Sequence, residues 1–90
     1  MEITDIKIKY LTNETKMKAV ASVTFDNALA IHDIKIIGTQ DKLFVAMPNR
    51  KAPDGTFRDT VHPINSAMRE QLEGAIIKKY REELEEKQEN

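Results

Sequence analysis

The hydrophobic residues of this 90-residue chain change their spacing once, and that change sets the order of its secondary structure. Apolar and polar residues alternate along residues 2–10 and again along 16–25, as in strands with one buried face. From Ser66 onward the apolar residues recur every three or four positions, as in an amphipathic helix. The chain is therefore expected to place its strands first and one helix last.

The alternation also assigns residues to strand faces. In the first strand it groups Thr4 with the apolar face that ends at Tyr10, and it leaves Ile3 on the opposite face. In the second strand one face carries Met17, Ala19, Ala21, Val23 and Phe25. Asp26 and Asn27 tolerate positive φ, so they are candidates for a two-residue turn. A third strand over residues 28–37 places Ile31 and Ile34 on opposite faces, which indicates cover on both sides.

The stretch LFVAMPNRKAPDGTFRDTVHPI, residues 43–64, predicts a β-hairpin. Its two extended runs are residues 43–47 and 56–61, and these are strands four and five. Pro53, Asp54 and Gly55 are typical turn residues, and the connection is too long for a bare two-residue turn. The hairpin would present Arg50 and Lys51 in its loop, which favours recognition over catalysis.

The predicted helix begins near Ser66, with Asn65 or Ser66 as its N-cap. Its apolar stripe consists of Met68, Leu72, Ala75, Ile76, Tyr80 and Leu84. Small alanines on strands two and three leave room for this helix to lie across the sheet. Gly74 costs about 1 kcal/mol relative to alanine in a helix, so a close approach to another backbone, in the sheet or a second subunit, is expected there.

These elements predict an α+β domain, an antiparallel meander of about five strands with a C-terminal helix. The domain is assigned to residues 1–84, and residues 85–90 form an acidic, frayed tail. The last nine residues carry a net charge of −4 and residues 1–81 a net charge of +3, against −1 for the whole chain. One helix covers five strands poorly, so a homodimer is expected.

Several function classes lack support in the sequence. The chain has no cysteine, no apolar run long enough to span a membrane and no signal-peptide core, which favours a cytoplasmic protein. No phosphate-binding glycine loop or metal-ligand spacing is present, so no cofactor or small-molecule substrate is expected. His32 and His62 are the candidates for catalysis. A hydrogen-bonded His32 and a backbone-capping His62 are the preferred interpretations, and the protein is expected not to be an enzyme.

The cations give the strongest functional signal. Arg50, Lys51 and Arg58 must lie close together if the hairpin forms. Ser66 and Arg69 lie in the first turn of the helix, whose N-terminus attracts phosphate. A dimer would double this patch along a duplex. The five residues are therefore the candidate nucleic-acid contacts, although each cation taken singly also fits a solvated surface.

The segments LFVAMPNRKAPDGTFRD and VHPIN, together with MEITDIKIKY and IHDI, resemble the SpoVG family of sporulation and septation proteins. The resemblance implies a small bacterial regulator that binds DNA, with RNA also reported, as a dimer formed through the sheet. It implies that the basic pair after FVAMP, here Arg50 and Lys51, contacts nucleic acid, and that the helix influences which sequence is bound. The first hypothesis is therefore a dimeric nucleic-acid-binding regulator, and the alternative is a septation-associated module that acts by protein contact alone.

Overall fold

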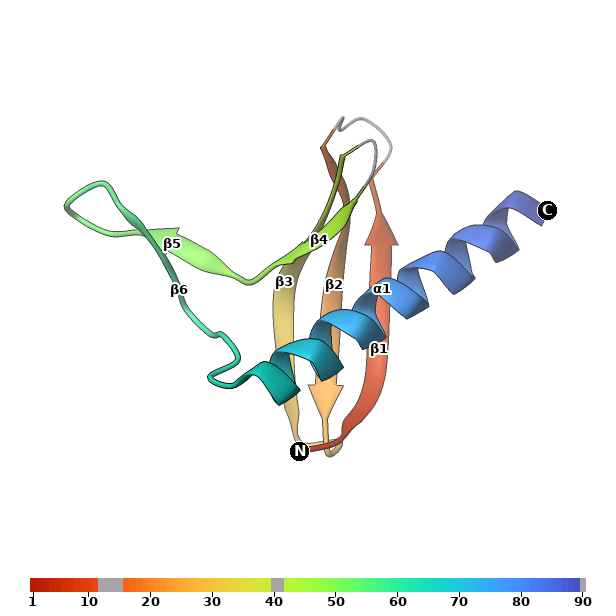
Figure 1. The fold of residues 1–90 in the computed structure, drawn as a ribbon, viewed down its shortest axis with the longest axis horizontal. Helices are drawn as coiled ribbons and strands as arrows, with labels where there is room; N and C mark the ends of the chain where they lie inside the picture. Colours follow the sequence, from red (N-terminus) through yellow and green to blue (C-terminus); the bar gives the residue numbers. More distant parts are fainter. Residues whose placement is uncertain (12–15, 40–41, 90) are drawn as a thin grey trace.

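The computed structural model describes residues 1–11, 16–39 and 42–89. Its elements are β1 (Ile3–Tyr10), β2 (Met17–Phe25), β3 (Leu29–Gly38), β4 (Leu43–Ala46), β5 (Asn49–Lys51), β6 (Phe57–Asp59) and α1 (Ser66–Glu89). Strands β1 to β4 form an antiparallel sheet in chain order, and β5 pairs with β6 in a separate two-stranded ribbon (Figure 1). The α+β class, the meander and the C-terminal helix are confirmed.

The β2–β3 turn forms as predicted at Asp26 and Asn27, whose φ angles are 51° and 52°. The Ala28 amide donates a 2.9 Å hydrogen bond to the Phe25 carbonyl and closes the turn. The Asp26 carboxylate also accepts a 3.0 Å bond from the Glu2 amide, which fastens the start of the chain to this turn. Aspartate and asparagine tolerate left-handed backbone, so they form the centre of the turn. Phe25 pairs with Leu29, so the connection also includes Ala28 and is one residue longer than the predicted two.

A β-bulge in β3 overturns the predicted assignment of its two faces. Ala21 pairs with Ile34 and Val23 pairs with Ile31, so Ser22 faces two residues, His32 and Asp33. Asp33 takes up the extra residue with a φ of 63°. A bulge shifts the alternation by one position. Ile31 and Ile34 therefore both pack toward the core, and the prediction that they lie on opposite faces was wrong.

A second irregularity lies between Ile3 and Asp5 of β1. It corrects the prediction for Thr4 and Ile3, because Ile3 packs against the core and Thr4 is exposed. The Thr4 hydroxyl instead serves the turn, accepting a 3.0 Å bond from the Asn27 amide. Hydrophobic alternation alone does not reveal such a shift, because it assumes regular pairing along the whole strand.

Helix α1 lies diagonally across one face of the four-stranded sheet (Figure 1). Ala19 and Ala21 of β2 are fully buried beneath the helix. Ile76, on the side of α1 that faces the sheet, is also fully buried. The alanines of β2 let the helix approach the sheet closely, as predicted. Ala28 and Ala30, for which the same role was predicted, are exposed, so that part of the prediction was wrong. Five of the six predicted members of the apolar stripe are buried or pack against the core: Met68, Leu72, Ile76, Tyr80 and Leu84. Ala75 is half-buried and lies outside this core cluster.

The start of α1 is capped as predicted. The Asn65 side-chain oxygen accepts a 2.7 Å hydrogen bond from the Met68 amide, one of the amides that the helix itself cannot pair. The helix continues through Glu89, and Asn90 lies outside the described residues. Fraying of residues 85–90 and the domain limit at residue 84 stay predictions. A Cβ at Gly74 would meet nothing within 4 Å, so the predicted close approach to the sheet was wrong.

Residues 43–64 fold differently from the predicted hairpin. β4 pairs with β3, from Gly38 opposite Leu43 to Lys35 opposite Ala46, and not with residues 56–61. Pro48 has no amide hydrogen to continue a ladder, and the chain leaves the sheet there. Asn49–Lys51, predicted as loop, form β5 and pair with Phe57–Asp59. The described strands therefore number six, in two sheets, rather than five in one.

No helix of the described residues covers the face of the sheet opposite α1 (Figure 1). Near its edge, Pro48, Asn49 and Thr60 line a depression together with Val20, Asp33 and Lys35. Ile37 of β3 lies opposite Phe44 of β4 on this face, and Phe44 is 48% exposed. Val20 of β2 is half-buried on the same face. The apolar remainder that the sequence predicts is therefore present.

Candidate nucleic-acid interface

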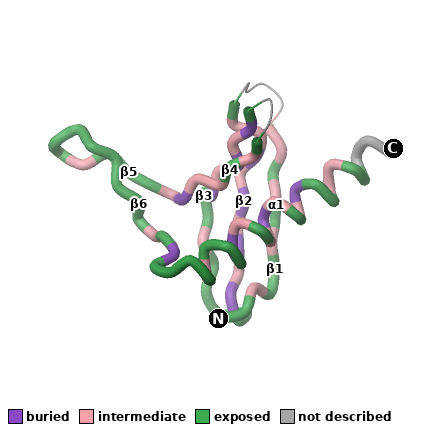
Figure 2. Tube along the Cα trace, in the orientation of Figure 1, coloured by how far each residue is buried: buried purple, intermediate pink, exposed green. Residues whose placement is uncertain are grey.

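Residues 49–59 form a β-ribbon that projects from the body, and we name it the arm (Figure 1). The amide and hydroxyl of Thr60 both donate to the Pro48 carbonyl oxygen, at 2.8 and 3.1 Å, and close the root of the arm. Nearly all of its residues are exposed (Figure 2). The arm is therefore a solvent-exposed ribbon made of two strands of three residues each.

The tip of the arm is built as a turn, as the sequence predicts. Asp54 Oδ1 accepts hydrogen bonds from the hydroxyl and the amide of Thr56, at 2.7 and 3.0 Å. These bonds lower the pKa of Asp54 below its usual value, the hydroxyl contributing most. Gly55 has a φ of 92°, which only glycine adopts readily. The carboxylate of Asp54 therefore has a structural role in the turn.

Arg50 and Arg58 lie directly opposite each other across the arm. Directly opposed residues of an antiparallel pair point to the same face, so both guanidinium groups leave the ribbon on one side. Like charges in this position destabilise a ribbon. Among residues 1–11, 16–39 and 42–89, neither arginine forms an ion pair. The arm thus holds two uncompensated cations side by side.

The opposite face of the arm carries Lys51 directly across from Phe57. Phe57 is 70% exposed, and the sequence alone did not single it out. The sequence feature that could have identified Phe57 is its position next to Arg58, directly after the turn residues Asp54 and Gly55. The predicted proximity of Arg50, Lys51 and Arg58 is confirmed, although Arg50 and Lys51 sit in a strand and not in a loop.

Ser66 and Arg69 lie together at the start of α1. They line an open depression of about 470 Å³ with His62, Pro63, Ile64 and Asn65. Arg69 Nη1 contacts Glu73 Oε2 at 3.3 Å, so its charge is partly compensated. The chain from β6 to α1 joins this cluster to the arm, but none of the residues that line the depression belongs to the arm. The structure therefore brings the five predicted residues together as two sets.

The two histidines have structural partners. Nδ1 of His32 lies 3.0 Å from the Ser22 hydroxyl, across the bulge. Nδ1 of His62 donates a 3.0 Å hydrogen bond to the Pro63 carbonyl oxygen, just before the helix. The predicted hydrogen-bonded His32 and backbone-capping His62 are both confirmed.

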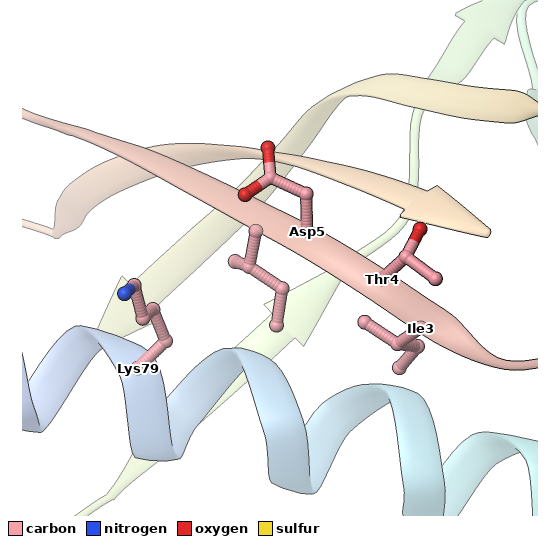
Figure 3. A pocket seen from close by; sticks show the side chains of 5 residues that line it. Ile3, Thr4, Asp5 and Lys79 are labelled. Carbon is pink, nitrogen blue, oxygen red and sulfur yellow. The ribbon is translucent and has the colours of Figure 1, made fainter. Parts of the chain in front are cut away.

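A shallow depression of about 280 Å³ lies between β1 and α1, lined by Ile3, Thr4, Asp5, Ile6 and Lys79 (Figure 3). The Asp5 carboxylate points away from the helix in Figure 3. Lys79 contacts Glu83 of its own helix at 3.5 Å. We assign no chemistry to this depression. Within the described ranges, no three acidic, histidine or cysteine side chains gather into a metal site.

Comparison with known proteins decides the family. A family model described as SpoVG matches residues 1–82 of the chain. The chain belongs to the SpoVG family. Relatives named septation protein SpoVG include one from Acetivibrio thermocellus, 59% identical over 89% of this chain and 85% of the relative. The SpoVG relative from Agathobacter rectalis is 53% identical over 94% of this chain and 98% of its own length. In the described part of this SpoVG chain, no helix combines the length and apolar character needed to cross a membrane.

Proposed function

We propose that the protein is a non-enzymatic regulator that binds nucleic acid as a homodimer in the cytoplasm. DNA is the first ligand and RNA the alternative, with no cofactor, small-molecule substrate or membrane contact. The relatives are named for septation, and we assign this chain a related role in gene expression, septation and, in spore-formers, sporulation.

The opposed arginines of the arm support this proposal most strongly. Two cations that repel each other across a ribbon cost stability unless an anion lies between or beside them. A phosphate backbone supplies such anions, and contacts to it release counterions. Arg50 and Lys51 are assigned to backbone phosphate on the two faces of the ribbon, and Arg58 supports Arg50 from the opposite strand. A two-stranded ribbon is also narrow enough to enter the major groove of a duplex.

Ser66 and Arg69 are assigned to a second contact that adjusts sequence choice. Their depression opens at the N-terminus of α1, where unpaired amides favour an anion. Arg69 would exchange Glu73 for a nucleic-acid contact. Arg69→Ala is therefore expected to change the preference among sequences more than the affinity for all of them.

The homodimer is proposed to form through the sheet face opposite α1. Ile37, Phe44 and Val20 supply its apolar centre. Sedimentation equilibrium should give the mass of two chains, and Phe44→Lys should shift it toward one chain. A mass of one chain at every concentration would refute the dimer without touching the arm.

The test of the binding site is a double substitution, Arg50→Ala with Lys51→Ala, measured by titration against duplex DNA at several salt concentrations. Loss of two phosphate contacts should make the slope of log affinity against log salt less steep by about 2. The matched control is Lys7→Ala with Lys9→Ala, which removes the same charge from exposed positions on β1. Equal losses of affinity in both double variants would mean that net charge alone causes the effect. Unchanged binding by a folded variant without Arg50 and Lys51 would exclude the arm as the binding site.

A second candidate function is a septation-associated module that acts by protein contact without nucleic acid. The exposed Phe44 on the uncovered sheet face and the acidic end of α1 favour it. Partners retained after nuclease treatment, and lost in Phe44→Lys, would support this module. Partners lost on nuclease treatment would favour the regulator.

A further inference from the structure

Phe57 is the one large apolar side chain of the arm, and nothing in the arm covers it. It is 70% exposed, on a ribbon whose other strand residues are polar or charged. The aromatic ring pair of the described residues is Tyr10 with Tyr80, far from the arm in the sequence, and Phe57 takes no part in it. An aromatic ring held out on a projecting ribbon is accessible to an outside partner, and aromatic side chains are enriched at interfaces.

The register of the arm places one cation beside this ring. Lys51 lies directly opposite Phe57, on the same face of the ribbon, and the next residue, Arg58, faces the other side. The Cβ atoms of directly opposed residues are about 4.5–5.5 Å apart. Two side chains that start this close together can reach the base and a neighbouring phosphate of one strand.

We propose that Phe57 stacks on an unpaired base while Lys51 holds a neighbouring phosphate. The ligand class is single-stranded nucleic acid, or a loop or bulge whose bases are exposed. The bases of an intact duplex are already stacked on each other, so they offer no free face to the ring. This inference rests on the proposed nucleic-acid function and adds the strandedness of the ligand and the residue that reads it.

Three substitutions at Phe57 separate stacking from simple hydrophobicity. Phe57→Tyr keeps an aromatic ring, Phe57→Leu keeps an apolar side chain without a ring, and Phe57→Ala removes both. Affinities are measured for an unstructured oligonucleotide and for the same strand annealed to its complement. We expect Phe57→Leu and Phe57→Ala to lose about tenfold or more on the single strand, within the range for one stacked base. Phe57→Tyr should retain the affinity, and duplex binding should change less than twofold.

A tryptophan at this position reports stacking directly, because the chain contains no other tryptophan. The emission of Phe57→Trp should be quenched when the single strand binds and should change little when the duplex binds. Binding of the single strand with unchanged emission would overturn the proposal. So would equal losses on both ligands in Phe57→Leu.

Two further outcomes separate this inference from the proposed function. If the unaltered protein binds neither ligand, the proposed function fails and the stacking role fails with it. If it binds the single strand and Phe57→Leu binds equally well, only the stacking role fails. Sedimentation of Phe57→Leu tests whether a second copy covers the ring instead, and a change from two chains to one would overturn stacking in favour of self-association.

Discussion

The Tyr10 hydroxyl donates a 2.8 Å hydrogen bond to the backbone carbonyl oxygen of Tyr80. The two rings lie with their centroids 5.3 Å apart at an interplanar angle of 32°. This contact joins the end of the first strand to the helix that closes the fold. The hydrogen bond lies at the edge of the apolar core. It can be removed by a substitution that keeps the aromatic ring in place.

Tyr10→Phe should lower the free energy of unfolding by about 0.5–1.5 kcal/mol, because it removes the hydroxyl and keeps the ring. Urea unfolding followed by circular dichroism measures the change. Tyr80→Phe is the matched control, since the bond from Tyr10 uses the backbone of Tyr80 and not its side chain. A larger loss in the control than in Tyr10→Phe would contradict this account.

The same residue predicts sensitivity to alkaline pH. Burial raises the pKa of Tyr10 from 10.0 to about 12, and the Glu83 carboxylate adds to the effect. Because the folded pKa is the higher one, the unfolded chain loses this proton first, and stability falls as pH rises from 10 to about 12. Urea unfolding of the unaltered protein and Tyr10→Phe across this range isolates the effect. The unaltered protein should lose more stability than the variant, and parallel profiles would exclude Tyr10 as the source.

Asn65→Ala should destabilise the start of α1 by about 0.5–2 kcal/mol, because it leaves the Met68 amide without its cap. Asn65→Asp keeps an oxygen at the same place and should retain most of the stability. Thermal unfolding of the two variants side by side measures the difference. Equal stability of both would show that the cap contributes nothing.

The bulge at Asp33 should tolerate glycine and resist valine. Its φ of 63° is open to glycine, whereas a β-branched residue there costs about 1–3 kcal/mol. Asp33→Gly is therefore expected to unfold at about the same urea concentration as the unaltered protein, and Asp33→Val at a lower one. Lys7→Val, at an exposed position in β1, controls for valine in a strand. A stable Asp33→Val would mean that β3 can realign without the bulge.

Gly74→Ala should stabilise the chain by about 1 kcal/mol, because a Cβ there has open space and alanine favours a helix. Thermal unfolding at low protein concentration measures this gain. The mass in solution should stay unchanged, since the proposed dimer contact lies on the opposite side of the sheet. A gain in stability with a loss of association would instead place Gly74 in the contact.

Much of this fold follows from the spacing of apolar residues. The strands β1 and β2, the turn at Asp26 and Asn27, the cap at Asn65 and the stripe through Ile76 all obey local rules that the sequence displays. Each depends on residues within a few positions of one another. The faces of β3 did not follow, because the shift at Asp33 depends on pairing with β2.

The candidate site was predictable in its residues but not in its arrangement. The basic residues of the arm could be found from their spacing around the turn at Gly55. Their opposition across the ribbon could not, because it depends on which residues leave the main sheet at Pro48. The exposure of Phe57 depends on the same departure, because it lies on the separate ribbon of β5 and β6 and not in the main sheet.

The closure between Thr60 and Pro48 has a consequence for how this chain can change. Two hydrogen bonds join these residues, so the chain enters and leaves the arm at the same point of the body. None of the buried core residues lies in the arm. Insertions or deletions in the arm should therefore leave the body folded. The length and sequence of the arm can then vary while the core of the body stays unchanged.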